Sequence, residues 1–138
     1  MRRAFVVILV AVAALVGSGA ASASNAAIVV PFEKHWVGPG HYVGTACNGG
    51  TIDMQLSDSY VTGDVQHFKA TVQLSFGGHS LTAVLDGRFN FSTLATVLNG
   101  VVTDGWLTGA QVHEEGQLVA FDPLTFVGTV QLMPGSAG

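Results

Sequence analysis

The sequence holds one cysteine, Cys47, in 138 residues. A single cysteine excludes both a scaffold held by internal disulfides and a zinc site built from four thiolates. Charged residues make up 10% of the chain, whereas typical soluble domains carry about 25%. Beyond residue 3 the basic residues are Lys34, Lys69 and Arg88. So few cations exclude a protein that binds nucleic acid or anionic lipid through a cationic patch.

Hydrophobic residues are abundant, at 49% of the chain. This fraction, rich in Val, Leu and Phe, indicates that the chain buries a core and is not disordered. Since a domain usually takes about 100–200 residues, the length predicts a single domain.

The first residues follow the pattern of a secretory signal peptide. Met1-Arg2-Arg3 is a short positive start, residues 4–16 are apolar, and Ala21-Ser22-Ala23 fits a cleavage site. We therefore assign residues 1–23 to a signal peptide and residues 24–138 to the mature domain, which we expect to be secreted by the general secretory route. The paired arginines leave the twin-arginine route open, and an uncleaved N-terminal anchor is the alternative. After cleavage no stable membrane span is expected, because the apolar run is shorter than the roughly 20 residues that cross a bilayer.

Residues 66–91 show the strongest pattern in the mature chain. Apolar residues alternate with polar ones from 66 to 76, and the alternation resumes from 81 to 91 after Gly77-Gly78. Period two is typical of a strand with one buried face, and two glycines suit a tight hairpin turn. We predict a long β-hairpin in which His67, Lys69 and Arg88 point to solvent.

Weaker alternation predicts further strands on both sides of this hairpin. Cys47-Asn48-Gly49-Gly50 is expected to be a turn before a strand at 51–56, and Gly63-Asp64 a turn after a short strand near Tyr60. Toward the C-terminus, strands are expected at 101–103, 106–112 and 125–132. Residues 92–100 fit either a short helix that begins at Ser92 or another strand.

About seven to nine short strands in a domain of this length predict an all-β fold, either a single antiparallel barrel of lipocalin-like size or a β-sandwich. Glycines expected within strands favour the barrel, because they relieve strain where a sheet curls. These are Gly44, Gly87, Gly109 and Gly128.

Aromatic residues are the candidate ligand-binding residues. Phe68, Phe76, Phe89 and Phe91 share the buried side of the central hairpin, and Tyr42 and Trp106 are candidates for the mouth of a barrel. In a sandwich these residues would fill the core. In a barrel of about eight strands they would line an interior wide enough for one small ligand.

Candidates for metal binding and catalysis are weaker. His35, His41 and Cys47 could supply nitrogen and sulfur ligands to a metal, but their spacing is not that of familiar sites, so we expect no metal and no cofactor. His113-Glu114-Glu115 begins like a metalloprotease motif, yet residue 117 is Gln, and we interpret the segment as a polar loop or strand end. No catalytic residue is predicted.

Glycines stand beside apolar residues in Gly100-Val101-Val102, in residues 105–110 and in Phe126-Val127-Gly128-Thr129. With these segments the overall plan resembles that of small exported bacterial proteins of unknown function, which combine a signal peptide with a glycine-rich all-β domain. The resemblance transfers no functional residue. The likeness to lipocalin or allene-oxide-cyclase barrels is one of strand number, and a fold does not by itself imply a function.

Three functions remain open at this point. The first is a non-enzymatic secreted protein that binds a small apolar ligand in a barrel. The second is an extracellular or cell-surface module that binds another protein through an exposed sheet face. The third is a small barrel enzyme of the isomerase or cyclase type, which would need a His, Tyr or carboxylate that points into the barrel.

Overall fold

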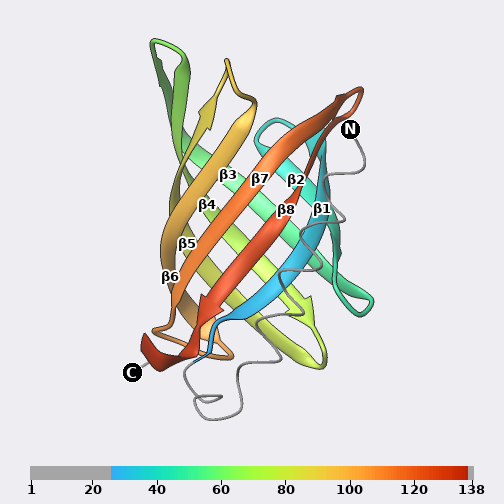
Figure 1. The fold of residues 1–138 in the computed structure, drawn as a ribbon, viewed down its shortest axis with the longest axis vertical. Coiled ribbons are helices and arrows are strands. Elements are labelled where there is room, and N and C mark those ends of the chain that lie inside the picture. The colour runs from blue at the N-terminus through green and yellow to red at the C-terminus, as the bar shows by residue number, and fades with distance from the viewer. Residues whose placement is uncertain (1–25, 137–138) are drawn as a thin grey trace.

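A computed structural model describes residues 26–136 of the chain (Figure 1). The predicted signal peptide, residues 1–23, lies outside the described residues. Eight strands follow one another, and a short 3-10 helix, η2 (Pro134–Ser136), comes after them. The strands are β1 (Ile28–Gly38), β2 (His41–Ala46), β3 (Gly50–Thr62), β4 (Val65–Phe76), β5 (His79–Asn90), β6 (Ala95–Gly105), β7 (Gln111–Phe121) and β8 (Leu124–Met133).

The strands form a closed antiparallel barrel in sequence order. Each strand pairs with the next, and β1 closes the ring by pairing with β8 from Ile28↔Leu132 to His35↔Thr125. The prediction of an all-β fold is therefore confirmed. Of the two predicted architectures, the structure is the barrel and not the sandwich. No helix within residues 26–136 is long and apolar enough to cross a membrane.

The up-and-down order gives the barrel two distinct ends (Figure 1). The turns β1–β2, β3–β4, β5–β6 and β7–β8 lie at one end, which we call the open end. The turns β2–β3, β4–β5 and β6–β7 lie at the other, the closed end, together with the start of β1 and the finish of β8. Residues early in an odd-numbered strand are thus near the closed end.

The central hairpin has the predicted register and turn. Phe68 pairs with Gly87 and Phe76 with His79, so residues of the apolar parity face the interior. Gly77 and Gly78 have φ values of 57° and 83°, a region that glycine adopts without steric cost and that a two-residue hairpin turn requires. Asn48 and Gly49 have φ values of 57° and 73°, and the turn predicted at residues 47–50 is confirmed.

Residues 92–100 resolve to a turn followed by a strand. The side chain of Asn90 accepts hydrogen bonds from the backbone N–H groups of Ser92 and Thr93 at 2.8 and 2.9 Å, and β6 then begins at Ala95. The helical alternative is wrong, because Asn90 and not Ser92 provides the capping oxygen and the segment turns once only. Leu94 completes the turn with a φ of 65°.

Three further expectations need correction. Residues 106–110 form the β6–β7 turn, so the strand expected at 106–112 begins only at Gln111, and Gly109 lies in that turn. Tyr60 does not begin a separate strand but continues β3, which carries a bulge between Ser57 and Tyr60. Residues 113–115 lie in the middle of β7, neither in a loop nor at a strand end.

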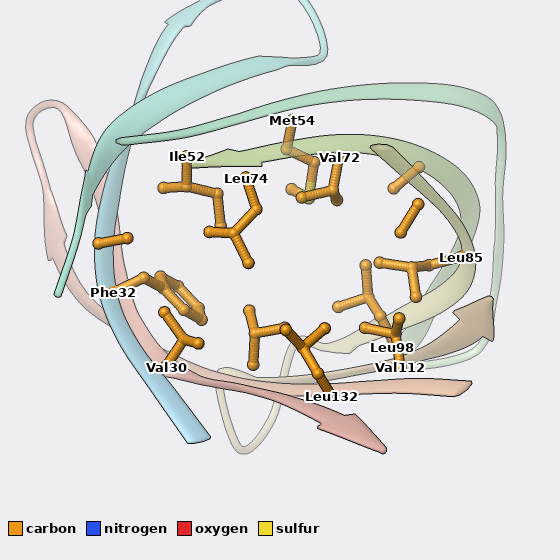
Figure 2. Packing of buried hydrophobic residues seen from close by; sticks show 14 of the residues in the cluster. Val30, Phe32, Ile52, Met54, Val72, Leu74, Leu85, Leu98, Val112 and Leu132 are labelled. Atoms are coloured by element: carbon orange, nitrogen blue, oxygen red, sulfur yellow. The ribbon is translucent and has the colours of Figure 1, made fainter. Parts of the chain in front are cut away.

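The apolar core fills the part of the barrel toward the closed end. Side chains such as Val30, Ile52, Leu74 and Leu132 are at most 1% exposed and point inside the ring of strands (Figure 2). At the closed end itself the ring of Trp106 stacks on His79 with 3.9 Å between centroids and meets Phe76 edge-on at 5.7 Å. These side chains cover the core at the closed end. The remaining interior space lies toward the open end.

Candidate ligand-binding cavity

A cavity of about 420 Å³ occupies the barrel toward its open end. This volume lies within the range of about 300–1,000 Å³ that small-molecule sites take. All eight strands and the β5–β6 turn contribute side chains to the wall, which is mainly apolar. The lining residues are Lys34, Tyr42, Met54, Leu56, Gln66, Phe68, Phe89, Phe91, Leu94, Thr96, Leu98, Leu118, Phe121, Leu124 and Phe126.

A chain of aromatic rings joins β2 and β8 to β5, on the other side of the cavity. Tyr42 meets Phe126 edge-on at 5.6 Å, Phe126 meets Phe89 at 5.8 Å, and Phe89 meets Phe91 at 5.2 Å. Edge-to-face contacts of this kind stabilise aromatic pairs beyond the area that they bury. The wall is therefore preformed by contacts among its own residues.

Phe68 is held in the cavity wall by the glycine opposite it. A Cβ atom at Gly87 would lie 2.6 Å from the Phe68 ring, which is too close for any side chain. The ring of Phe68 therefore covers the bare backbone of β5, as aromatic residues do across from glycine in curved sheets.

The six predicted ligand-binding residues divide between the two ends of the barrel. Tyr42, Phe68, Phe89 and Phe91 line the cavity. Phe76 and Trp106 do not, because they pack against each other at the closed end. The alternation fixes which face of a strand a residue occupies, but its height in the barrel depends on how the strands are staggered.

Two charged residues that were not predicted as site residues lie inside the barrel. Lys34 and Glu114 are 2% and 0% exposed, and the ammonium Nζ contacts the carboxylate Oε2. Nζ also lies 3.2 Å from the Met54 sulfur and 4.7 Å from the centre of the Phe32 ring, where a cation is attracted by the ring face. Lys34 reaches the cavity wall, whereas Glu114 lies behind it and its Oε1 has no hydrogen-bond partner among the described residues.

The sequence carried a signal for this pair. Lys34 continues the buried parity of Val30 and Phe32, and Glu114 continues that of Val112 and leads to Leu118. A charged residue on the apolar face of a strand needs a partner of opposite charge, because an isolated buried charge is very costly. Reading 113–115 as a polar loop concealed the alternation in β7.

Tyr42 is the member of the aromatic chain that carries a polar group. Its side chain is half-buried, and burial raises the pKa of the phenol above the usual 10.0, because the charged phenolate is poorly solvated there. Near neutral pH the group is therefore a neutral phenol that can donate or accept a hydrogen bond.

The three candidate metal ligands are not brought together. His41 begins β2 at the open end and pairs with Asp53 at 3.1 Å on the outer surface, while Cys47 follows the other end of that strand. Six residues of extended chain span about 20 Å. His35 lies in β1, where its backbone is in register with Val43 of β2 and not with His41. Within residues 26–136 no group of three or more His, Cys, Asp or Glu side chains is placed to hold a metal ion.

The outer wall of the barrel carries charged and polar side chains that pair with one another. Lys69 pairs with Asp86 at 2.8 Å across β4 and β5, and Arg88 and His67 share that face. His113 contacts Asn99 at 2.6 Å and Glu115 at 2.8 Å. The solvent-facing positions predicted for His67, Lys69 and Arg88 are confirmed.

Exposed apolar side chains gather at the open end. They lie on the last residues of β1, β3 and β7 and just after β5, and each is more than 40% exposed. They are Trp36, Val37, Tyr60, Val61, Phe91, Val119 and Phe121. Because Phe91 and Phe121 also line the cavity, the apolar surface continues from the rim into the interior.

Comparison with known proteins finds no match among protein-family models, curated proteins or solved structures. The resemblance to small exported bacterial proteins stays a prediction, and the cavity has to be interpreted from its own chemistry.

Proposed function

We propose that the protein binds a small apolar molecule inside the barrel and does so outside the cytoplasm. The observation that carries the proposal is the cavity of about 420 Å³, which has an apolar wall and an apolar rim. A ligand that enters would exchange water for contact with aliphatic and aromatic side chains, and burial of apolar surface supplies roughly 25 cal/mol per Å². Export follows from the prediction for residues 1–23 and is part of the proposal.

The polar groups of the cavity support a ligand with one polar end. Lys34, Tyr42, Gln66 and Thr96 are the lining residues with side chains that can form hydrogen bonds. Ligand pockets commonly combine an apolar wall with a few polar groups that fix orientation. Since Lys34 and Thr96 are buried, the polar end of a ligand that reaches them would be shielded from water.

A fluorescent fatty probe whose emission rises in apolar surroundings tests the proposal. We expect saturable binding at one site per chain, with displacement by long-chain alcohols. Leu118→Trp, which places a large ring in the cavity, should abolish binding. Val101→Trp adds the same ring to the outer wall, where Val101 is 44% exposed, and should bind as the unaltered protein does. Equal binding by both variants would place the probe outside the barrel and refute the proposal.

A second candidate, a small enzyme of the isomerase or cyclase type, is favoured by one observation. Such an enzyme needs a Tyr, His or carboxylate directed into the barrel, and Tyr42 and Glu114 are inside it. Incubation with bound apolar compounds followed by mass spectrometry and chromatography separates the two candidates. A binding protein returns each compound unchanged, whereas an isomerase or cyclase returns a product of the same mass with a different retention time.

A further inference from the structure

Lys34 is a buried primary amine that faces an apolar cavity. Its Nζ lies among Glu114 Oε2, Met54 and the Phe32 ring, and the residue also borders the cavity. A lysine at such a site can act as a nucleophile toward a carbonyl carbon, provided that a neighbouring group takes its proton. The Glu114 carboxylate touches the ammonium and can take that proton.

The charges around Lys34 favour an uncharged ligand. The ammonium of Lys34 and the carboxylate of Glu114 together have a net charge of zero. The other lysine and arginine side chains of residues 26–136, Lys69 and Arg88, are on the outer wall. A ligand carboxylate beside Lys34 would set two negative charges against one ammonium in a site of low polarity, and an unpaired buried charge is very costly. A ligand ammonium would meet Lys34 itself. A neutral carbonyl group satisfies the site without adding a charge.

We propose that Lys34 forms an imine with an apolar aldehyde held in the cavity, an inference that rests on the proposed function. Lys34 passes one proton to Glu114, and the nitrogen lone pair then forms a bond to the aldehyde carbon. The nitrogen loses its second proton to the former carbonyl oxygen, which gives a carbinolamine. Glu114 returns its proton to the hydroxyl group, the carbon–oxygen bond breaks, and water leaves.

The product is a protonated imine paired with the Glu114 carboxylate. One positive and one negative charge are present before and after the reaction, so the buried pair stays neutral throughout. The apolar wall limits the access of water, which slows hydrolysis of the imine. The aldehyde chain would contact the aromatic rings of the cavity toward the open end.

The test is reductive trapping with decanal and cyanoborohydride, followed by peptide mass mapping. Cyanoborohydride transfers hydride to the imine carbon and leaves a stable secondary amine. The chain provides its own control, because Lys69 also pairs with a carboxylate, that of Asp86, but on the outer surface. We expect modification of Lys34 to exceed that of Lys69 by at least about tenfold, because a bound aldehyde is held beside the amine.

Two variants separate the covalent step from binding and folding. Lys34→Arg keeps a cation next to Glu114 but cannot form an imine, so it should lose the adduct, and displacement of the probe by decanol, measured on the same variant, shows whether the cavity still binds. Glu114→Gln keeps the amine but cannot accept its proton, so trapping at residue 34 should slow. Far-ultraviolet circular dichroism shows whether each variant keeps its strands.

Decanol, which has the same chain and no carbonyl group, distinguishes the possible failures. If decanol displaces the fluorescent probe but decanal leaves no adduct at Lys34, the imine is refuted and the proposed function stands. Equal modification of Lys34 and Lys69 also refutes it. If neither compound displaces the probe, the cavity does not bind such molecules and both proposals fail.

Discussion

The effect of replacing Lys34 on stability depends on whether Glu114 is present, and the reverse also holds, because the two side chains form an ion pair inside the barrel. Lys34 and Glu114 are both almost fully buried and touch each other, so each is the main compensation for the charge of the other. Removing one partner leaves an uncompensated charge in the interior, whereas replacing both with apolar residues of similar volume removes the need for compensation.

We therefore predict opposite outcomes for single and double substitution of the pair. Glu114→Leu alone should lower the free energy of unfolding by about 3–5 kcal/mol. Combining it with Lys34→Met should restore the stability to near that of the unaltered protein. Urea unfolding followed by circular dichroism measures both. Additive losses in the double variant would show that the charges do not depend on each other.

Because of Tyr42, the free energy of unfolding is expected to fall when the pH becomes alkaline. Burial raises the pKa of its phenol in the folded protein above the value of 10.0, so the folded state holds the proton more tightly than the unfolded state does. Its contribution is complete below pH 10.0 and is lost as the pH rises through the raised value. In Tyr60→Phe, where Tyr42 is the remaining tyrosine, the absorbance of tyrosinate should appear above pH 10.0. Adding Tyr42→Phe should remove this loss of stability.

Individual side chains were predicted unevenly from the sequence. The inward position of Phe68 and the outward position of Lys69 followed from alternation alone. Composition treats Lys34 only as a charge, whereas its place in the alternation after Val30 and Phe32 puts it on the buried side. Its partner Glu114 is 80 residues away in the sequence, and no local pattern joins residues so far apart.

The β4–β5 hairpin is the element in which sequence and backbone agree most closely. Alternation fixed its faces, and Gly77-Gly78 fixed its turn, since few residues other than glycine adopt positive φ at low cost. The turn at Asn90 was harder to predict, because a short apolar segment with a possible cap fits a helix as well as a strand. Pairing of β6 with both β5 and β7 decides that case, and pairing is not a local property.

The turn of this hairpin gives a direct test. Gly78 has a φ of 83° with nothing within 4 Å of a Cβ atom, so Gly78→Ala introduces backbone strain without a clash. We expect it to lower the free energy of unfolding by about 1 kcal/mol. Gly38 also has open space around a Cβ atom but no positive φ, so Gly38→Ala is the matched control and should leave stability unchanged or slightly higher.

The whole barrel is packed unevenly along its axis. Leu74 and Leu98 are both 1% exposed, but Leu98 borders the cavity and Leu74 does not. The number of strands left both a barrel and a sandwich open and the glycines within strands only favoured the barrel, whereas no feature of the sequence measured the cavity. Its volume depends on the stagger of the strands and on how far the side chains of opposite walls reach, and neither is written in a pattern of one strand.

Truncation of these two leucines should reveal the difference. Leu→Ala in a protein core costs about 2–5 kcal/mol, depending on how many contacts are lost and how large a void remains. Leu74→Ala should lie toward the upper end of that range and Leu98→Ala toward the lower end, since Leu98 has fewer neighbours to lose. Chemical denaturation of the two variants measures the losses, and equal losses would indicate uniform packing.

Both ends of the described chain leave the barrel on the side away from the cavity. Ile28 at the start of β1 pairs with Leu132 near the finish of β8, beside the covered end (Figure 1). A molecule tethered directly at residue 26 or at residue 136, on a sensor chip or through a fused partner, would point its mouth away from the attachment. Immobilisation through a tag joined at residue 26 and through one joined at residue 136 should therefore leave ligand uptake equally fast.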